Sequence, residues 1–563
     1  MPAPGKRAVA RLHSLVVARR EVWSAIIRSV EWVGFSGVRG IETVLLLVVL
    51  GTVVAAFAGR LRVPAPSLLV IAGLVAGLLP GVPTVHVPPD VVSLVVLPPL
   101  LYAASEELPW RELRVLWRPV VVLAVGLVLA SAGAVAAVTG AVAAVPAGMA
   151  FVLGAVLAST DPVAVSALGR RLSLPPRVQA LVQGESLFND ATSLVLFQIA
   201  VAAAVAGPAT GSAAAAVLHG ALRFVVLAAG GAAVGAVVAV VVIVIRRRVT
   251  DPVLETVLAL ITPYGAFLLG EAVHVSPVMA VIVTGLVIGT WRERITTAQT
   301  RLQLHSVYQT VIFLLESVVF SLIGLELPAL IRALAHAEAW PAEALAVAGT
   351  LIAMRIVWVF PLSALLQRRS KTRQRSWAVP AVVSWAGTRG VVPLAAALSI
   401  PLTTDSGAPL PGRDLVLVLA TAVIVVSLIV QGLTLEPLAR FAGIARPGPA
   451  RHEETLARLR LAEAALARLD EIAGDQASPD DVIDRVRDSL HARIHRGRVQ
   501  AGRAHAPDHD GLTERDLRRE LIAAENAELI RLFQSGEISQ AARQRLQRDL
   551  DLEATRLGGD LPG

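Results

Sequence analysis

The sequence predicts an all-α integral membrane protein with about thirteen transmembrane helices, followed by a helical cytoplasmic tail. Hydrophobic residues make up 55% of the 563 residues and charged residues only 17%, whereas soluble domains usually carry about a quarter charged residues. Apolar stretches close to the roughly 20 residues that a bilayer crossing requires recur between residues 41 and 440. The loops between these stretches are alternately rich and poor in arginine.

The apolar stretches divide the chain into three regions. Residues 1–40 form a basic N-terminal extension, 41–440 a transmembrane region, and 446–563 a polar tail that reads as helices. The extension lacks the long apolar core of a signal peptide, so an interfacial helix and a later translation start both stay open. The spans are expected near 42–59, 65–82, 88–104, 119–140, 147–168, 178–205, 217–245, 252–272, 276–291, 305–327, 343–366, 379–400 and 413–436.

Basic residues occupy every second loop between the predicted spans. By the positive-inside rule these loops face the cytoplasm, which also places the C-terminal tail there, with the protein in the plasma (inner) membrane. The same loops account for the net charge of +8, so we expect no nucleic-acid partner. The chain contains no cysteine, which excludes disulfides and thiolate metal sites.

Ionisable side chains gather in three of the predicted spans: Asp161 in the fifth, Glu185 and Asp190 in the sixth, and Arg389 in the twelfth. A charge at bilayer depth costs at least about 2.5–3.5 kcal/mol, so it normally faces a partner or a wet cavity. Three carboxylates against one guanidinium leave excess negative charge. A cation or a proton would neutralise that excess, so the pattern favours cation–proton exchange over a purely structural set of ion pairs.

Spacing in the sixth span sharpens this hypothesis. Ser186 and Asp190 lie four residues apart on one helix face and together offer a hydroxyl and a carboxylate to a hard cation such as Na⁺. Glu185 lies on the neighbouring stripe of the helix. We expect Glu185 to pair with Arg389.

The fifth and twelfth spans each carry a predicted interruption. Pro162 removes a backbone donor and pushes the preceding residue, Asp161, away from helical geometry. In the twelfth span Gly387, Gly390 and Pro393 surround Arg389. Broken segments at matching places in two inverted six-helix repeats are typical of a transporter binding site.

These residues carry a resemblance to a known family. Ser159-Thr160-Asp161-Pro162, Gly184-Glu185-Ser186-Leu187-Phe188-Asn189-Asp190 and Gly387-Thr388-Arg389-Gly390 resemble the motifs of the bacterial Na⁺/H⁺ exchangers of the first monovalent cation:proton antiporter family. The resemblance extends over about residues 41–440. It implies a homodimer, a thirteen-helix fold with inverted repeats, and an elevator-like movement of a core bundle.

The resemblance also implies roles for individual residues. Asp190 would bind the cation and the proton in turn, and Asp161, Thr160 and Ser186 would line the same site. Asn189 would hold the broken fifth span, and Glu185 and Arg389 would form a structural bridge. An Asn-Asp pair in place of two aspartates implies electroneutral exchange of one Na⁺ (alternatively Li⁺ or K⁺) for one H⁺, and a part in sodium transport and pH homeostasis.

One position departs from the family pattern. Many relatives carry an acid after the Pro-Pro pair of the third span, where this chain has Ala103. Other charged residues in or near spans are expected to have structural roles: Arg355 by pairing with helix-end carbonyls, and Glu316 and Glu326 by helix packing or interface pairing.

Two further classes of membrane protein stay open, a cation channel and a membrane-embedded sensor with the tail as output. The histidines lack ligand spacing, and no phosphate-binding loop or nucleophile elbow appears. We therefore expect no enzyme, no cofactor, and no metal other than the transported monovalent cation.

Overall fold

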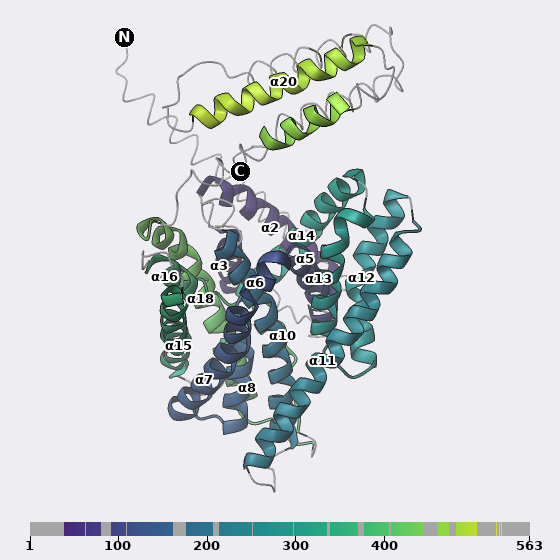
Figure 1. The fold of residues 1–563 in the computed structure, drawn as a ribbon. Coiled ribbons are helices and arrows are strands. Elements are labelled where there is room, and N and C mark those ends of the chain that lie inside the picture. The colour runs from purple at the N-terminus through teal and green to yellow at the C-terminus, as the bar shows by residue number, and fades with distance from the viewer. Residues whose placement is uncertain are drawn as a thin grey trace, which may run out of the picture. The chain divides into compact units, whose positions relative to one another are not determined.

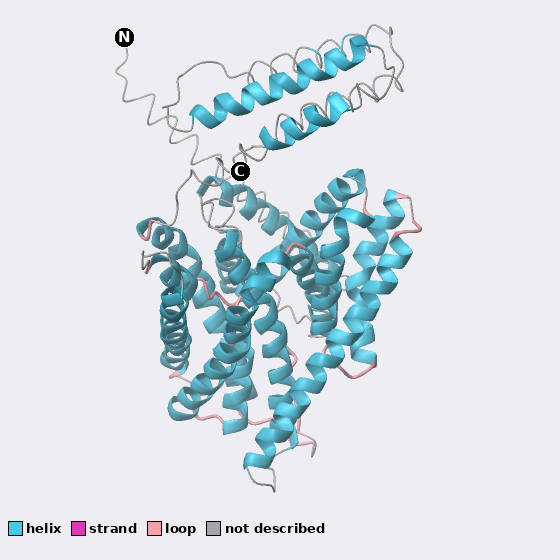
Figure 2. Cartoon of the chain, in the orientation of Figure 1, coloured by secondary structure: helices cyan, strands magenta, loops and turns pink. Residues whose placement is uncertain are grey.

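The computed structural model contains helices and loops, with no β-strand among the residues that it describes (Figure 2). The described residues are 39–61, 64–79, 92–108, 110–161, 176–206, 213–249, 251–296, 298–334, 338–369, 377–404, 407–443, 459–471 and 480–503, together with 525, 529 and 531. The basic extension expected at residues 1–40 lies almost entirely outside them.

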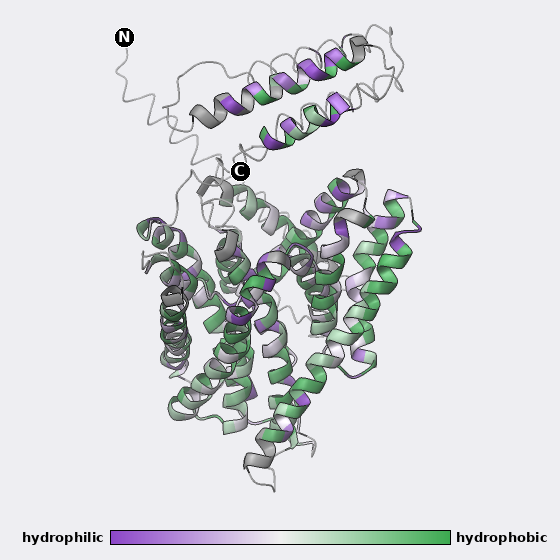
Figure 3. Cartoon of the chain, viewed as in Figure 1, coloured by the Kyte–Doolittle hydropathy of each residue, from purple (hydrophilic) through white to green (hydrophobic). Residues whose placement is uncertain are grey.

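The chain forms two compact units, Met1–Ala445 and Arg446–Gly563. Hydrophobic residues dominate the helices of the first unit, whereas the described helices of the second alternate hydrophobic and hydrophilic residues (Figure 3). In the second unit α20, Asp480–Arg503, lies beside a helical segment at 459–471. Two ion pairs join these helices, Arg487–Asp470 and Arg498–Glu463, each with a nitrogen–oxygen distance of 3.3 Å.

Helices occupy each segment in which the first seven spans were predicted (Figure 1). π-Helical turns occur in two of these segments, one before α5 and one between α6 and α7, and such turns are often found at functional sites. The helices are α2 (Arg39–Leu61), α3 (Ala65–Leu78), η1 and α5 (Val92–Val96 and Leu97–Glu106), α6, η2 and α7 (Trp110–Val121, Val122–Leu127 and Val128–Val142), α8 (Ala147–Leu157), α10 (Pro176–Ala206) and α11 (Ala213–Arg246).

The second half of the transmembrane unit follows the predicted segments as well. The predicted twelfth span is divided into two short helices, and the helices before it are long. They are α12 (Pro252–Ala272), α13 (Pro277–Ile295), α14 (Ala298–Ala333), α15 (Trp340–Arg369), α16 (Ala378–Trp385), α17 (Val391–Leu398) and α18 (Arg413–Phe441).

The number of membrane crossings stays a prediction. By length and composition alone, seven helices within the described residues are long and apolar enough to span a bilayer, and five further apolar helices are shorter. The broken fifth and twelfth spans contribute only short pieces, because each helix stops within the bundle.

Two groups of helices lie in the transmembrane unit beside α2, α3 and α14, which pack on one another. One contains α7, α8, α10 and α15–α18, where α7 packs on α8 and α15, and α10 packs on α8. The other contains α5, α11, α12 and α13, with α13 packing on all three of its neighbours. Figure 1 shows α7, α8 and α15 on one side of the unit and α11, α12 and α13 on the other. The broken helices belong to the first group.

Candidate ion-binding site

The two predicted interruptions are present, and they meet. Helix α8 ends at Leu157, and the twelfth-span segment is non-helical between α16 and α17. The backbone N–H of Asp161 donates to the carbonyl of Thr388 at 2.7 Å. The Thr388 hydroxyl donates back to the carbonyl of Asp161 at 3.0 Å. These two bonds satisfy backbone groups that the breaks leave unpaired, as a membrane interior requires.

Asp161 lies directly against the backbone of the other break. A Cβ atom on Gly390 would overlap the Asp161 carboxylate, so only glycine admits the carboxylate here. Asp161 is the last residue of the fifth-span segment within the described part of the chain, because residues 162–175 lie outside it. The effect of Pro162 on the segment beyond the break therefore stays a prediction.

Helix α10 presents its polar face to the first break. Asn189 donates from Nδ2 to the Thr160 hydroxyl at 2.7 Å, and its Oδ1 accepts from the Thr160 N–H at 3.4 Å. The Ser186 hydroxyl donates to the carbonyl of Thr160. Three contacts thus hold Thr160 on α10. Ser186 and Asp190 share a face, as predicted, but the Ser186 hydroxyl is engaged with this backbone.

Asp190 lies one turn beyond Ser186 on α10 and is 6% exposed. Its Oδ1 accepts a hydrogen bond from the Ser159 hydroxyl, whereas no described residue donates to Oδ2. The carboxylate also interacts electrostatically with Asp161 and Glu185. Ser159 was not among the predicted site residues. Its position in the Ser159–Pro162 run, next to the break, was the available signal.

The expected Glu185–Arg389 pair is wrong. Glu185 is bound instead by Arg355 of α15, with Nη1–Oε1 at 2.6 Å and Nη2–Oε2 at 2.9 Å. The Arg355 Nε donates to the carbonyl of Val383 at 3.1 Å, so every guanidinium nitrogen has an acceptor. The physical reason is that α15 packs on α16, which brings the planar fork of Arg355 in line with the carboxylate.

Arg389 bonds backbone carbonyls, the role that the sequence suggested for Arg355. Its Nε donates to the carbonyl of Leu157 at 2.9 Å, and its Nη1 donates to the carbonyl of Gly387. Its backbone N–H donates to the Ser427 hydroxyl at 2.9 Å. The guanidinium therefore lies at the C-terminal end of α8, where a positive charge complements the helix dipole. The two arginines have exchanged the roles predicted for them.

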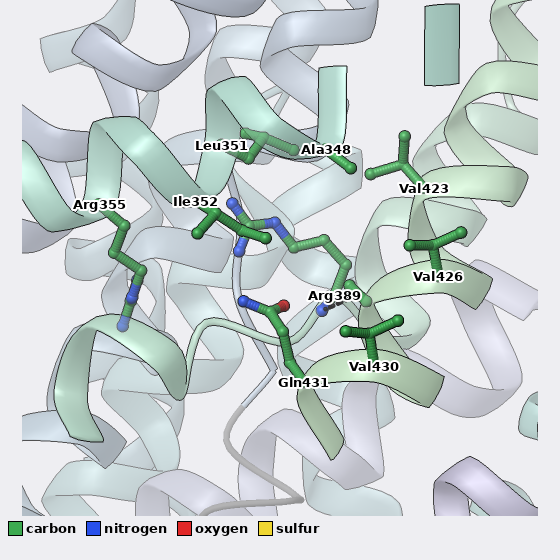
Figure 4. Close-up of a pocket in the computed structure, with 10 residues that line it drawn as sticks. Ala348, Leu351, Ile352, Arg355, Arg389, Val423, Val426, Val430 and Gln431 are labelled. Carbon is green, nitrogen blue, oxygen red and sulfur yellow. Dashed lines mark hydrogen bonds between the residues drawn. The ribbon is translucent and has the colours of Figure 1, made fainter. Parts of the chain in front are cut away.

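A pocket lies beside these two arginines, between α15, the second break and α18 (Figure 4). Its walls are mostly apolar. Besides the two arginines, its buried polar side chains are Ser427 and Gln431 of α18. The lining residues are Ala348, Leu351, Ile352, Arg355, Arg389, Val423, Val426, Ser427, Val430 and Gln431.

Two further positions singled out in the sequence, Ala103 and Glu326, lie on α5 and α14. Ala103, where relatives carry an acid, is buried in α5. Glu326 in α14 is 9% exposed and its Oε2 has no hydrogen-bond partner among the described residues. The structure thus brings together five of the predicted site residues: Asp161, Thr160, Ser186, Asn189 and Asp190. At Ala103 it has a buried methyl group where relatives carry an acid.

Comparison with known proteins adds the identity of the fold. The family model described as "Sodium/hydrogen exchanger, transmembrane" matches residues 44–441. The uncharacterized Na(+)/H(+) exchanger Rv2287 of Mycobacterium tuberculosis is 35% identical over 530 residues, covering 92% of this chain and 95% of the relative. The Na(+)/H(+) antiporter ApNhaP of Aphanothece halophytica is 28% identical, covering 73% of this chain and 76% of the relative.

A solved structure shares the architecture. The sodium proton antiporter MjNhaP1 of Methanocaldococcus jannaschii matches with a TM-score of 0.57 at 21% identity, covering 72% of this chain and 98% of the neighbour. At this identity the likeness concerns the fold. The family model covers the whole region that contains both breaks and α10. The chain therefore belongs to the family of transmembrane sodium/hydrogen exchangers.

Proposed function

We propose that this chain exchanges Na⁺ for H⁺ across the membrane, one for one, with Asp190 as the residue that binds each in turn. The supporting observation is the Asp190 carboxylate, buried at the crossing of two broken helices with no described donor to Oδ2. Because no described residue donates to that oxygen, we assign it to the cation or the proton. The printed names of the relatives as Na(+)/H(+) exchangers and antiporters support the same assignment.

The charges around the crossing support a stoichiometry of one to one. Three carboxylates (Asp161, Glu185 and Asp190) face two guanidinium groups (Arg355 and Arg389), which leaves one formal negative charge. One monovalent cation or one proton neutralises it. Asn189 cannot titrate, and its amide holds Thr160. The exchange is therefore electroneutral.

The remaining ligands come from the breaks themselves. Asp161, Thr160 and Ser186 lie around the first break, and oxygen ligands of this kind suit Na⁺, with Li⁺ and K⁺ as the competing substrates. The Glu185–Arg355 pair supports the site by occupying a guanidinium that would otherwise be a counter-ion for Asp190. Arg389 supports it by holding the carbonyl ends of the break.

Alternating access fits this geometry. The two breaks are hydrogen-bonded to each other and to α10, so the broken-helix group can carry the ion past α5 and α11–α13 as one body. In keeping with the family resemblance, the transporter works as a homodimer in the plasma membrane. Its second unit lies in the cytoplasm, and its activity contributes to pH homeostasis.

Flux through reconstituted protein tests the proposal. Asp190→Asn should abolish Na⁺-driven proton movement in proteoliposomes while the protein stays folded, because the amide can neither release a proton nor balance a cation. Asp414→Asn is the matched control, since Asp414 is exposed and its Oδ1 lies 3.7 Å from Arg413 Nη1. It should retain full exchange.

The same vesicles separate an exchanger from a channel. Electroneutral exchange should proceed at one rate whether the membrane potential is clamped at zero or imposed, and should saturate with Na⁺, Li⁺ or K⁺. A current, or full exchange by Asp190→Asn, would refute the proposal.

A further inference from the structure

A second group of buried charged side chains lies away from the ion site. Its members stand where α5 ends, α11 ends, α12 begins and α13 ends, so they gather at one end of the α5/α11–α13 group. Within their side chains, Arg246 is 0% exposed, Glu255 5% and Glu106 7%, while Arg292 is 26% exposed. The exchange proposed above makes no use of these residues.

The ion pairs within this group are loose. Arg246 reaches Glu255 through one bond only, Nη2–Oε1 at 2.9 Å, and the Thr296 hydroxyl at 3.3 Å. Arg292 Nε lies 3.8 Å from Glu106 Oε1, too far for a hydrogen bond. Glu106 interacts electrostatically with Arg246 as well as with Arg292. The two pairs therefore influence each other without direct contact.

Five polar atoms of this group have no hydrogen-bond partner among the described residues. They are Arg246 Nε and Nη1, Arg292 Nε, Glu106 Oε1 and the hydroxyl of Tyr102. Tyr102 lies one turn before Glu106 on α5 and interacts electrostatically with both Glu106 and Arg246. Buried polar atoms are normally paired with protein or with ordered water, so a cluster of five calls for an occupant.

The charges decide the class of occupant. Among the four charged members of this group, two guanidinium groups and two carboxylates cancel, which favours neither an anion nor a cation. Glu107 also acts on Glu106, but its side chain is 57% exposed and therefore screened by solvent. The unpaired atoms include N–H donors, a carboxylate acceptor and a hydroxyl, so the occupant must both accept and donate. We propose that buried water molecules bridge Arg246, Glu106, Arg292 and Tyr102. They join the ends of α5, α11, α12 and α13 in one hydrated network.

A neighbouring tyrosine supplies an internal comparison. The rings of Tyr102 and Tyr308 stack with their centroids 5.9 Å apart. The Tyr308 hydroxyl donates to the carbonyl of Ala259 at 2.8 Å, so the protein satisfies it. The Tyr102 hydroxyl has no such acceptor among the described residues and depends on the proposed water.

X-ray radiolytic footprinting of the intact, purified protein tests this directly, because bound water is converted to hydroxyl radical beside the side chains that it touches. Tyr102 should be modified several-fold faster than Phe320, although both are 0% exposed, since Phe320 lies in the apolar core. Modification of Tyr102 as slow as that of Phe320 would overturn the proposal.

A thermodynamic cycle provides the second test. The effect of Tyr102→Phe on the unfolding equilibrium in mixed micelles should differ by about fivefold or more between the native and Arg246→Met backgrounds. Tyr308→Phe, the matched control, should have the same effect in both. Equal effects of Tyr102→Phe in the two backgrounds would contradict a water bridge. A coupling that changes when chloride is replaced by sulfate would assign the site to an anion instead.

If Arg246→Met does not fold, Arg246→Lys takes its place in the cycle. Lysine keeps the charge but removes the planar fork, so the effect of Tyr102→Phe should still differ between the native and Arg246→Lys backgrounds. An equal effect of Tyr102→Phe in the native and Arg246→Lys backgrounds would mean that charge alone links the two side chains, which would contradict the proposal. Footprinting of the native chain decides independently of either variant.

Discussion

Among the described residues of the transmembrane unit, two arginine–glutamate pairs that are buried on both sides are built in different ways. At the crossing of the broken helices, Arg355 grips Glu185 through both ends of its fork, and its Nε bonds a carbonyl. In the α5/α11–α13 group, Arg246 reaches Glu255 through one bond, and its Nε and Nη1 have no described protein partner. The same two side-chain types thus form one pair in which every guanidinium nitrogen has a protein acceptor, and one pair in which two guanidinium nitrogens have none among the described residues.

The difference indicates how each ion pair should respond to substitution. A guanidinium whose nitrogens are all bonded to protein acceptors has no N–H group left for water to pair. A pair with free donors can bind water and yield to small movements. Buried charges in this chain are therefore not interchangeable structural ties, and substitutions should reveal two different costs.

The largest expected contrast comes from neutralising the two glutamates. Glu185→Gln leaves Arg355 buried without its counter-charge and should cost about 3–5 kcal/mol of stability. Glu255→Gln should cost about 1–3 kcal/mol, because the proposed water can solvate Arg246. Thermal unfolding in detergent, followed by tryptophan fluorescence, measures both. Equal losses would end the distinction between a pair bonded fully by protein and a pair that depends on the proposed water.

A methyl group at the crossing sharpens the same comparison. Gly390→Ala places a Cβ on the Asp161 carboxylate, so it should cost about 1–3 kcal/mol of stability. By misplacing Asp161 it should also lower the exchange rate by about tenfold or more. Gly349→Ala on α15 is the control, because its Cβ would meet nothing within 4 Å. Wild-type exchange by Gly390→Ala would show that the position of Asp161 is not critical.

The smallest effect is expected at Ser427. Ser427→Ala removes the acceptor for the backbone N–H of Arg389 and should lower stability by about 1 kcal/mol. Ser306→Ala, which removes an exposed hydroxyl bonded to its own helix at 3.1 Å, should leave stability unchanged. The same unfolding assay applies. A loss at Ser427 as large as that of Glu185→Gln would mean that Arg389, and not Glu185, anchors the bundle.

Much of the fold could be predicted because the bilayer imposes local rules. Apolar length located the helical segments, and Pro162, Gly387 and Gly390 marked the breaks. Proline and glycine also occur inside unbroken helices such as α12 and α15, so the informative feature was their place beside an intramembrane charge in each half of the chain. The polar face of α10 followed from spacing of four residues. The sequence by itself therefore determined the helical segments, the interruptions and the acids on which the proposed site rests.

The partners of the buried arginines could not be predicted from the sequence. Arg355 and Arg389 are both intramembrane guanidinium groups, and sequence distance says nothing about which one meets Glu185. Packing of α15 on α16 brought Arg355 to the carboxylate, and the break carried Arg389 to the end of α8. Ser159 likewise reached Asp190 only through the geometry of the break. Tertiary structure decided these pairings, because an ion pair depends on where helices cross and on which acceptors each crossing leaves open.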